Sequence, residues 1–421
     1  MSVASSAIQI EPNVDWANVN WPSVRAQFPG LNRIINGKPL IYLDSANTAQ
    51  KFESAILASD HYYREYTANV FRSVHTMGEE ATVAFEAARD SVAKLIHGPD
   101  RAEIIFTRGT TESINLVAHS FGSKFIKAGD VILLTELEHH ANIVPWQMLC
   151  ERVGATIRVV PISDDGVLDL DSAERLLTDD VKLFAFTHIS NALGTVNPAQ
   201  ALCAMALARG IPTLIDGSQA APHMHVDVQV LGCDFYVFTG HKVFAPTGTG
   251  VLWGKRQWLE AMPPFLGGGE MIERVSFQGT TYSGIPNKFE AGTPNIAGVI
   301  GLGAAIESLL ALGIDAVAVR EKELAVYAHE KLKTIEGLRL FGPNARAPVF
   351  SFAVKNAHAH DLAMLLDQEG IAIRSGQHCA HPLMQRLGVS ATARASLAFY
   401  NTEAEIDAFI RGILKAQRIL A

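Results

Sequence analysis

The sequence has few cysteines, and they stand far apart. Its 421 residues include only four, Cys150, Cys203, Cys233 and Cys379, with no C-x-x-C pair among them. This spacing excludes a disulfide framework and a zinc ribbon. It is typical of a protein kept in a reducing compartment. We therefore expect no metal site and no structural disulfide.

Basic runs and long uninterrupted apolar runs are also missing. The formal net charge is −8, from 35 basic and 43 acidic side chains, so nucleic acid and anionic membranes are poor candidates as partners. Residues 1–22 lack the basic start and apolar run of a signal peptide. The most apolar stretch, 296–314, contains Glu307 and four glycines, which favours a buried helix over a membrane span. We expect a cytoplasmic protein.

Short β-rich runs alternate with helical segments from about residue 80 to 255. This alternation predicts an α/β domain with a mostly parallel sheet, whose ligands bind at the carboxyl ends of the strands. In the helix expected at 171–177, Asp171 and Glu174 are predicted to form a capping box. The predicted strands are 103–107, 131–135, 156–160, 181–187, 212–216 and 234–239. The predicted helices are 83–96, 111–121, 171–177, 198–208 and one that opens near Pro145.

A second, smaller α/β unit is predicted in the C-terminal part. The stretch "LGGGEMI" (266–272) breaks the alternation, and a charged helix is expected over about 315–336. We predict a large domain over 35–308. The small domain is predicted to combine 1–34 with 309–421 and to carry the loop of Cys379.

Two residues at the ends of successive predicted strands have the character of a cofactor site. Asp216 ends an apolar strand, where a buried carboxylate is costly unless a cation faces it; the alternative is a helix cap. Lys242 follows the next strand, 26 residues later, in a turn rich in Gly and Pro. A lysine there is usually solvated, but a Schiff-base lysine sits in a pocket that favours its neutral amine. The pair matches the needs of pyridoxal 5′-phosphate (PLP), a lysine for its aldehyde and a carboxylate for its pyridine nitrogen.

The same region offers an anion site and an adjacent histidine pair. In "IIFTRGTTESINL" a glycine turn leads to Thr110 and Thr111, which open a helix, and a helix N-terminus favours a phosphate. Taken alone, this is an ordinary capped turn. His139 and His140 follow another strand, but adjacent histidines do not face one metal ion on a helix. Stacking on an aromatic ring and plain packing remain the two interpretations for them.

Nine motifs in order carry a resemblance to a known family. Together they resemble the class V aminotransferase-like PLP enzymes, and most closely the SUF-type (group II) cysteine desulfurases, over about residues 40–402. They are "YLDSA" (42–46), "RGTTESINLVA" (108–118), "EHHANIVPW" (138–146), "SNALGT" (190–195), "DGSQA" (216–220), "GHK" (240–242), "FEAGTPN" (289–295), "RSGQHCA" (374–380) and "RASLAFYNT" (394–402).

The resemblance implies the fold type I architecture of PLP-dependent transferases and a set of cofactor contacts. Lys242 matches the lysine that bonds to PLP and later moves protons. Asp216 matches the partner of the pyridine nitrogen, and Gln219 the ligand of the ring hydroxyl. His139 matches the stacking histidine and an acid/base group. The matching phosphate positions are Thr111, Thr239 and His241 of this chain, and Thr293 at the site of the other subunit of a homodimer.

The resemblance also implies a substrate and a nucleophile. Asn191 and Arg394 match residues that hold the carboxylate of L-cysteine, with Arg374 in support. Cys379 matches the cysteine that takes the substrate sulfur as a persulfide and leaves alanine. We hypothesise that His378, Arg374 and bound substrate raise the thiolate fraction of Cys379. The sulfur is expected to leave through a docked SUF-type acceptor protein for iron–sulfur cluster assembly.

Several positions depart from the family pattern. Gln377 stands where a histidine is common, Ala245 replaces a usual glycine, and Asn47 interrupts "DSAA". The alternatives left open are selenocysteine lyase activity, another class V reaction such as transamination or kynureninase-type cleavage, and a PLP-binding scaffold in a sulfur-transfer complex. A dinucleotide-binding enzyme is disfavoured because no G-x-G-x-x-G follows the first strand of the sheet.

Overall fold

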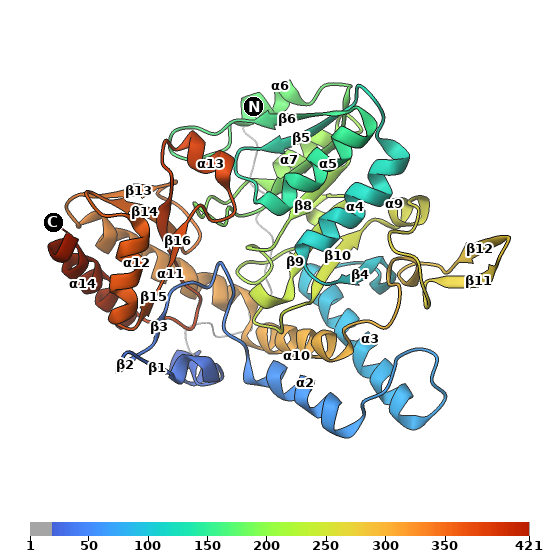
Figure 1. The fold of residues 1–421 in the computed structure, drawn as a ribbon, viewed down its shortest axis with the longest axis horizontal. Coiled ribbons are helices and arrows are strands. Elements are labelled where there is room, and N and C mark those ends of the chain that lie inside the picture. The colour runs from blue at the N-terminus through green and yellow to red at the C-terminus, as the bar shows by residue number, and fades with distance from the viewer. Residues whose placement is uncertain (1–18, 421) are drawn as a thin grey trace.

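A seven-stranded sheet forms the centre of the larger unit in this computed structural model, which describes residues 19–420 (Figure 1). Its strand order is β4-β10-β9-β8-β7-β5-β6. All neighbours from β9 to β6 are parallel, and β10 alone runs antiparallel to both its neighbours. The strands are β4 (Ile104–Thr107), β5 (Val131–Thr135), β6 (Thr156–Val160), β7 (Val181–Thr187), β8 (Thr213–Asp216), β9 (Phe235–Thr239) and β10 (Gly250–Gly254). The predicted mostly parallel sheet is confirmed.

Helices cover both faces of this sheet and bury its strands on both sides. Along β7, Leu183 and Ala185 pack into one apolar cluster, with α4 and α5, while Phe184 and Phe186 pack into the other, with α3, α7 and α10. Alternate side chains of a strand point to opposite faces, which accounts for the division. The helices of this unit are α2 (Glu53–Glu65), α3 (Thr76–Ile96), α4 (Thr110–Phe125), α5 (Val144–Val153), α6 (Leu170–Leu176), α7 (Ala199–Leu207), α8 (Val228–Leu231), α9 (Arg256–Ala261) and α10 (Ile296–Leu312).

The smaller unit is a four-stranded antiparallel sheet covered by helices. The strand order is β13-β14-β17-β16, with β13 (Leu338–Phe341), β14 (Val349–Val354), β16 (Arg374–Gly376) and β17 (Thr392–Ser396). Its helices are α11 (Ile314–Lys333), α12 (Ala359–Gln368), α13 (His381–Arg386) and α14 (Glu403–Leu420). The loop of Cys379 joins β16 to α13, as part of the connection between two neighbouring strands.

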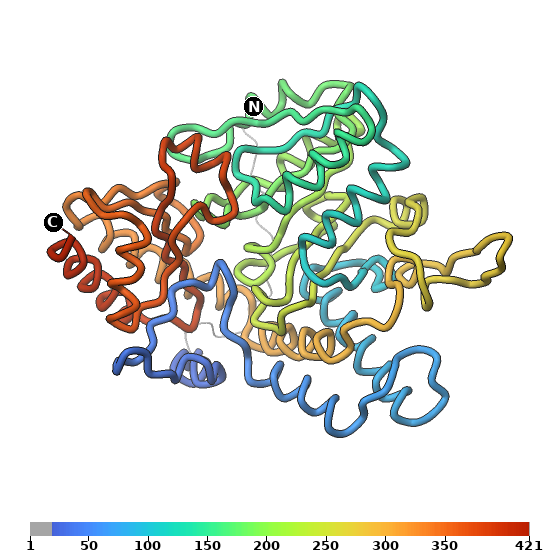
Figure 2. Tube along the Cα trace, in the orientation of Figure 1, coloured from blue at the N-terminus to red at the C-terminus, as the bar shows by residue number. Residues whose placement is uncertain are grey.

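The N-terminal segment runs beside the smaller unit before it enters the larger one (Figure 2). It contains α1 (Trp21–Arg25) and the short strands β1 (Ile34–Ile35), β2 (Lys38–Pro39) and β3 (Ile41–Tyr42), and β3 pairs in parallel with β15 (Ile371–Ala372). The pairing extends the contact with the smaller unit past residue 34, where we placed a boundary. Residues 1–18 of the predicted small domain lie outside the described residues, and the boundaries stay predictions.

A cluster of aromatic rings next to the turn of Lys242 joins the two units. Phe28 of the N-terminal segment lies 4.4 Å from Phe52 and 4.8 Å from Tyr400, measured between ring centroids. Phe244, two residues after Lys242, lies 4.8 Å from Phe399. All five side chains are buried. Aromatic pairs at these distances add to the free energy of burial, so this cluster fixes the turn against both units.

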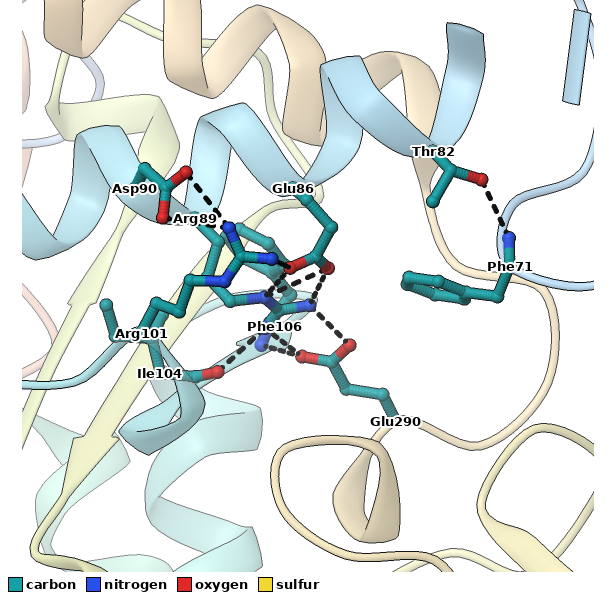
Figure 3. A network of polar contacts seen from close by, with 9 residues as sticks. All are labelled: Phe71, Thr82, Glu86, Arg89, Asp90, Arg101, Ile104, Phe106 and Glu290. Atoms are coloured by element: carbon teal, nitrogen blue, oxygen red, sulfur yellow. Dashed lines mark hydrogen bonds and ion pairs between the residues drawn. The ribbon is translucent and has the colours of Figure 1, made fainter. Parts of the chain in front are cut away.

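A buried ion-pair network fixes a second segment of the chain (Figure 3). The guanidinium of Arg89 on α3 donates to Glu290 at 2.7 and 3.0 Å, and Glu290 also accepts from the backbone N–H of Phe106 on β4 at 2.7 Å. Glu86 contacts the same guanidinium, which lies 4.5 Å from the ring of Phe106. A buried pair of this kind is costly to break on one side only. The network therefore holds the segment after Glu290, which carries Thr293, against the sheet.

Two local predictions differ from the structure. Helix α6 begins at Leu170 and is capped by Asp169, whose side chain accepts from the backbone N–H of Ser172 at 3.0 Å, so the capping box at Asp171 and Glu174 was wrong. The hairpin of β11 (Ile272–Ser276) and β12 (Gly279–Tyr282) was not predicted, since almost all of its side chains are exposed and give no burial pattern.

The apolar stretch at 296–314 contains all of α10, whose side chains are largely buried. Within residues 19–420, no single helix is long and apolar enough to cross a membrane. Helices α10 and α11 reach that length only together, and the chain bends by 77° between them.

Candidate active site

One cavity of about 620 Å³ gathers nearly all the predicted site residues between the two units. The carboxyl ends of the parallel strands contribute one side, and the β16–β17 region contributes the other. The predicted residues that line it are Thr110, Thr111, His139, Asn191, Asp216, Gln219, Thr239, His241, Lys242, Arg374, Cys379 and Arg394. The chain thus brings together residues up to 284 positions apart (394 − 110).

Thr293 is the predicted residue that does not line this cavity. It is exposed and lines a neighbouring cavity of about 500 Å³, with Arg108 and Glu112 shared between the two. That Thr293 serves the site of a second copy of the chain stays a prediction.

Lys242 ends a short 3-10 helix that begins directly after β9. Burial lowers the pKa of this amine to about 8, although the Asp216 carboxylate acts in the opposite direction. A substantial fraction of the amine is therefore neutral near physiological pH. A neutral lysine amine is the form that attacks an aldehyde, as the Schiff-base prediction requires.

Asp216 combines the two interpretations that the sequence left open. Its Oδ1 caps the following turn, because it accepts from the backbone N–H of Ser218 at 3.0 Å and from its hydroxyl at 2.6 Å. The Ser218 hydroxyl in turn lies 2.7 Å from Oγ1 of Thr110. Both contacts fall on Oδ1, which leaves Oδ2 for a group in the cavity. Ser218 was missed in the sequence, where only its place two residues after Asp216 pointed to this turn.

The predicted phosphate region lies at the N-terminus of α4. Gly109 precedes the helix without a side chain to cap it, and Thr110 and Thr111 supply hydroxyls there. The first N–H groups of a helix have no partner within it and attract an anion. Burial, then the charge of Lys242, lowers the pKa of His241 to about 4, so this imidazole is neutral. Gln219 donates its amide to the backbone O of Ala46 at 2.7 Å, which orients its side chain in the cavity.

His139 is held as a neutral imidazole. Its Nδ1 accepts from the backbone N–H of Ala141 at 3.0 Å, so the ring proton belongs on Nε2. Burial, then the charge of Lys242, lowers the pKa of His139 to about 3. The preceding Glu138 is buried and accepts from Thr135, Asn142 and the backbone N–H of Thr187 at 2.5–3.0 Å, which fixes the segment.

Two arginines face each other on adjacent strands at the cavity. Arg374 of β16 and Arg394 of β17 are directly paired in the antiparallel register. Like charges in such positions repel, so the site favours an anion between them. Asp44, which we did not predict, accepts from Arg394 at 3.1 Å and offsets part of the charge. Burial lowers the pKa of Arg394 to about 10, and it stays cationic at neutral pH. Its buried Nε has no hydrogen-bond partner among the described residues.

The Cys379 loop has a strained backbone. His378 and Cys379 both have left-handed φ angles, of 52° and 55°, each of which costs a non-glycine residue about 1–3 kcal/mol. Asn191 of the larger unit donates its side-chain amide to the backbone O of His378 at 2.8 Å. The guanidinium of Arg374 lies 3.7 Å from Sγ of Cys379. A cation at this position stabilises a thiolate.

His378 supplies no positive charge beside the thiol of Cys379. Burial, then the charge of Arg394, lowers the pKa of His378 to about 3, and the ring is neutral. Its Nε2 lies 2.8 Å from the hydroxyl of Thr392. Asn47, one of the departures from the family pattern, lines the cavity and accepts from Arg374. Arg374 is therefore the charged side chain that contacts Cys379.

The side chains at this cavity fit PLP. They offer a lysine with a lowered pKa, a carboxylate oxygen that faces the cavity, and a helix N-terminus with hydroxyls for a phosphate. Within residues 19–420, no group of three or more His, Cys, Asp or Glu side chains is placed to hold a metal ion.

Known proteins match this chain over nearly its whole length. It is 56% identical to a probable cysteine desulfurase of Xylella fastidiosa (strain 9a5c) over 403 residues, which cover 95% of this chain and 96% of that protein. It is 50% identical to a cysteine desulfurase of Yersinia pestis (strain Pestoides F) over 405 residues, which cover 96% of this chain and all of that protein.

Solved structures give the same picture of the fold. The crystal structure of the cysteine desulfurase CsdA (S-sulfonic acid) from Escherichia coli superposes with a TM-score of 0.90 and 41% sequence identity. The match covers 96% of this chain and 100% of that one. The predicted fold type I architecture is therefore confirmed. Residues 41–409 match the family described as aminotransferase class-V. The chain belongs to the class V aminotransferase family.

Proposed function

We propose that this protein is a PLP-dependent cysteine desulfurase, which converts L-cysteine to L-alanine and leaves the sulfur on Cys379 as a persulfide. The observation that carries the proposal is that Cys379 lines the same cavity as Lys242 and Asp216, with its Sγ 3.7 Å from the guanidinium of Arg374. A transaminase needs the lysine and the carboxylate but has no use for a thiolate at this position.

The side chains at the cavity have separate tasks in this reaction. Bound PLP supplies an electron sink for the electron pair released at the α carbon of the substrate. Lys242, with a pKa of about 8, takes and returns protons near neutral pH. Asp216 would face the pyridine nitrogen with its carboxyl group, and Arg394 holds the substrate carboxylate with a planar donor set. Asn191 also holds the loop of the nucleophile, through the backbone O of His378.

The sulfur step balances without an external oxidant. The thiolate of Cys379 attacks the sulfur of the substrate, an S–S bond forms, and the C–S bond breaks. The electron pair of the broken bond stays on the substrate carbon, which takes up a proton to become the methyl group of alanine. The neutral His139, with its proton on Nε2, and the amine of Lys242 are the groups at the cavity that can hold such a proton.

The proposal also covers the oligomeric state of the protein, the acceptor of its sulfur and its place in the cell. The protein acts as a homodimer in which Thr293 reaches the phosphate of the partner's site, and it passes sulfur to a SUF-type acceptor protein for iron–sulfur cluster assembly in the cytoplasm. The exposed position of Thr293 and the fully exposed Phe277 at the tip of the β11–β12 hairpin support a second copy.

The test is an assay of the purified yellow protein with L-cysteine and a thiol reductant, beside a Cys379→Ser variant. We expect alanine and sulfide in equal amounts from the wild type alone. Amino-acid turnover by both proteins without sulfide indicates another class V reaction, and PLP binding without any turnover indicates the scaffold. A comparison of the turnover rates on L-cysteine and on selenocysteine separates a desulfurase from a selenocysteine lyase.

A further inference from the structure

A pair of histidines ties the Cys379 loop to the larger unit. The rings of His140 and His381 stack with centroids 4.7 Å apart and an angle of 8° between their planes. The backbone N–H of His381 donates to Nε2 of His140 at 3.0 Å, and Nδ1 of His381 lies 2.9 Å from the same nitrogen. In the other direction, the backbone N–H of His140 donates to the carbonyl of Cys379 at 2.8 Å.

This geometry requires that His140 be neutral. A backbone N–H can only donate, so the Nε2 that receives it from His381 must carry a lone pair. A proton on that nitrogen would place two N–H groups head to head and would lose the contact. The stacked imidazole of His381 adds a second reason, because two imidazolium rings at this distance repel each other.

We propose that His140 and His381 form a clamp that holds the loop of Cys379 in the cavity, and that protonation of His140 releases it. The inference rests on the proposed role of Cys379 as the nucleophile. Both residues are positioning residues, since their contacts are with the loop and not with the reacting atoms. The strained φ angles of His378 and Cys379 make such a clamp necessary, because a strained loop keeps its shape only when surrounding contacts hold it.

The direction of the pH effect follows from the groups around His140. Burial, then the neighbouring His381, lowers the pKa of His140 below its ordinary value of 6.5. His139 faces it on its own segment, and Cys379 contacts it through the backbone carbonyl. A group with a lowered pKa in the closed state favours that state above its ordinary pKa. The clamp is therefore complete above pH 6.5 and is lost progressively as the pH falls below it.

The experiment is amide hydrogen exchange of the full-length holoprotein, read by mass spectrometry on the peptide that spans residues 377–386. Protection is compared at about pH 7.5 and about pH 5.5, on either side of the ordinary histidine pKa, after correction for the intrinsic exchange rates. We expect protection of this peptide in the wild type to fall about tenfold at the lower pH, the scale of one lost hydrogen bond and its neighbours.

Two substitutions of His140 separate the effect of its acceptor nitrogen from the effect of its aromatic ring. His140→Gln offers an amide oxygen that accepts from the N–H of His381 but does not titrate, so protection stays high at both pH values. His140→Phe keeps a flat ring without an acceptor, so protection is already low at the higher pH. His381→Ala keeps the backbone N–H that donates to His140 but removes the stacking and the Nδ1 contact, for an expected loss of about threefold. His360→Gln, an exposed histidine on α12, is the matched control and behaves as the wild type.

Equal protection of the wild type at both pH values overturns the proposal, as does wild-type protection in His140→Phe. The measurement needs no substrate. A protein that fails to release alanine from L-cysteine therefore contradicts the proposed function and leaves the exchange result to decide on the clamp.

Discussion

The two sides of the cavity are built in different ways. Asp216 is the last residue of β8, and Lys242 ends the 3-10 helix that follows the neighbouring strand β9, so the buried seven-stranded sheet fixes both. Cys379 stands in a loop with two left-handed residues, held by Asn191 and His140 from the other unit. The difference indicates that the sheet itself fixes the residues on the cofactor side. The position of the nucleophile depends instead on a few side-chain and backbone contacts, which single substitutions can remove.

The largest effect is expected on the cofactor side. Lys242→Ala removes both the covalent partner of the cofactor and the group that moves protons. We expect alanine release to fall by at least ~10⁴-fold and the visible absorption of the bound cofactor to change. Steady-state rates and an absorption spectrum measure both. Turnover within a factor of a few of the wild type would remove Lys242 from its role.

A change on the other side of the cavity separates the two halves. Cys379→Ser leaves the strand ends intact, so we expect a wild-type absorption spectrum and normal binding of L-cysteine. Alanine release should fall by at least about 100-fold, because the hydroxyl is a poor nucleophile toward sulfur. A spectral titration with L-cysteine and an alanine assay check the two statements. A variant that loses the cofactor as well would show that the halves are not independent.

A smaller effect is expected where the two sides meet. Arg394→Lys keeps a positive charge but loses the planar donor set that suits a carboxylate. We expect KM for L-cysteine to rise by about 10–100-fold, the scale of one charge-assisted hydrogen bond, with a smaller change in kcat. Initial rates over a range of cysteine concentrations measure this. A KM equal to that of the wild type would assign the carboxylate to another residue.

The smallest predicted effect is a pH dependence of cofactor loading. Lys242 has a pKa lowered to about 8, and only its neutral form reacts with an aldehyde. The loading rate of the apoprotein with PLP should rise about tenfold per pH unit below 8 and level off above it. Stopped-flow absorbance at several pH values tests this. A plateau that begins only near the ordinary lysine pKa of 10.5 would mean that burial does not act on this amine.

The sequence predicts the cofactor side of the cavity better than the side of the Cys379 loop. The strands before Asp216 and Lys242 are continuous apolar runs, and two successive parallel strands necessarily bring their carboxyl ends together. The contacts of Asp44 with Arg394 and of His140 with His381 join residues hundreds of positions apart. No local pattern encodes such contacts, because they follow from how the two units pack. The cap of α6 at Asp169 was missed for a local reason, since Asp169 and Asp171 both suit a helix start.

The central claim is that Cys379 takes the sulfur, and intact-mass analysis tests it most directly. The holoprotein is mixed with one equivalent of L-cysteine without reductant, and the mass of the chain and of its Cys379 peptide is recorded. We predict a gain of one sulfur atom on Cys379, removed by a thiol and matched by an equal amount of alanine. Alanine formed without sulfur on Cys379, or sulfur found on the buried Cys150, Cys203 or Cys233 instead, would contradict the account.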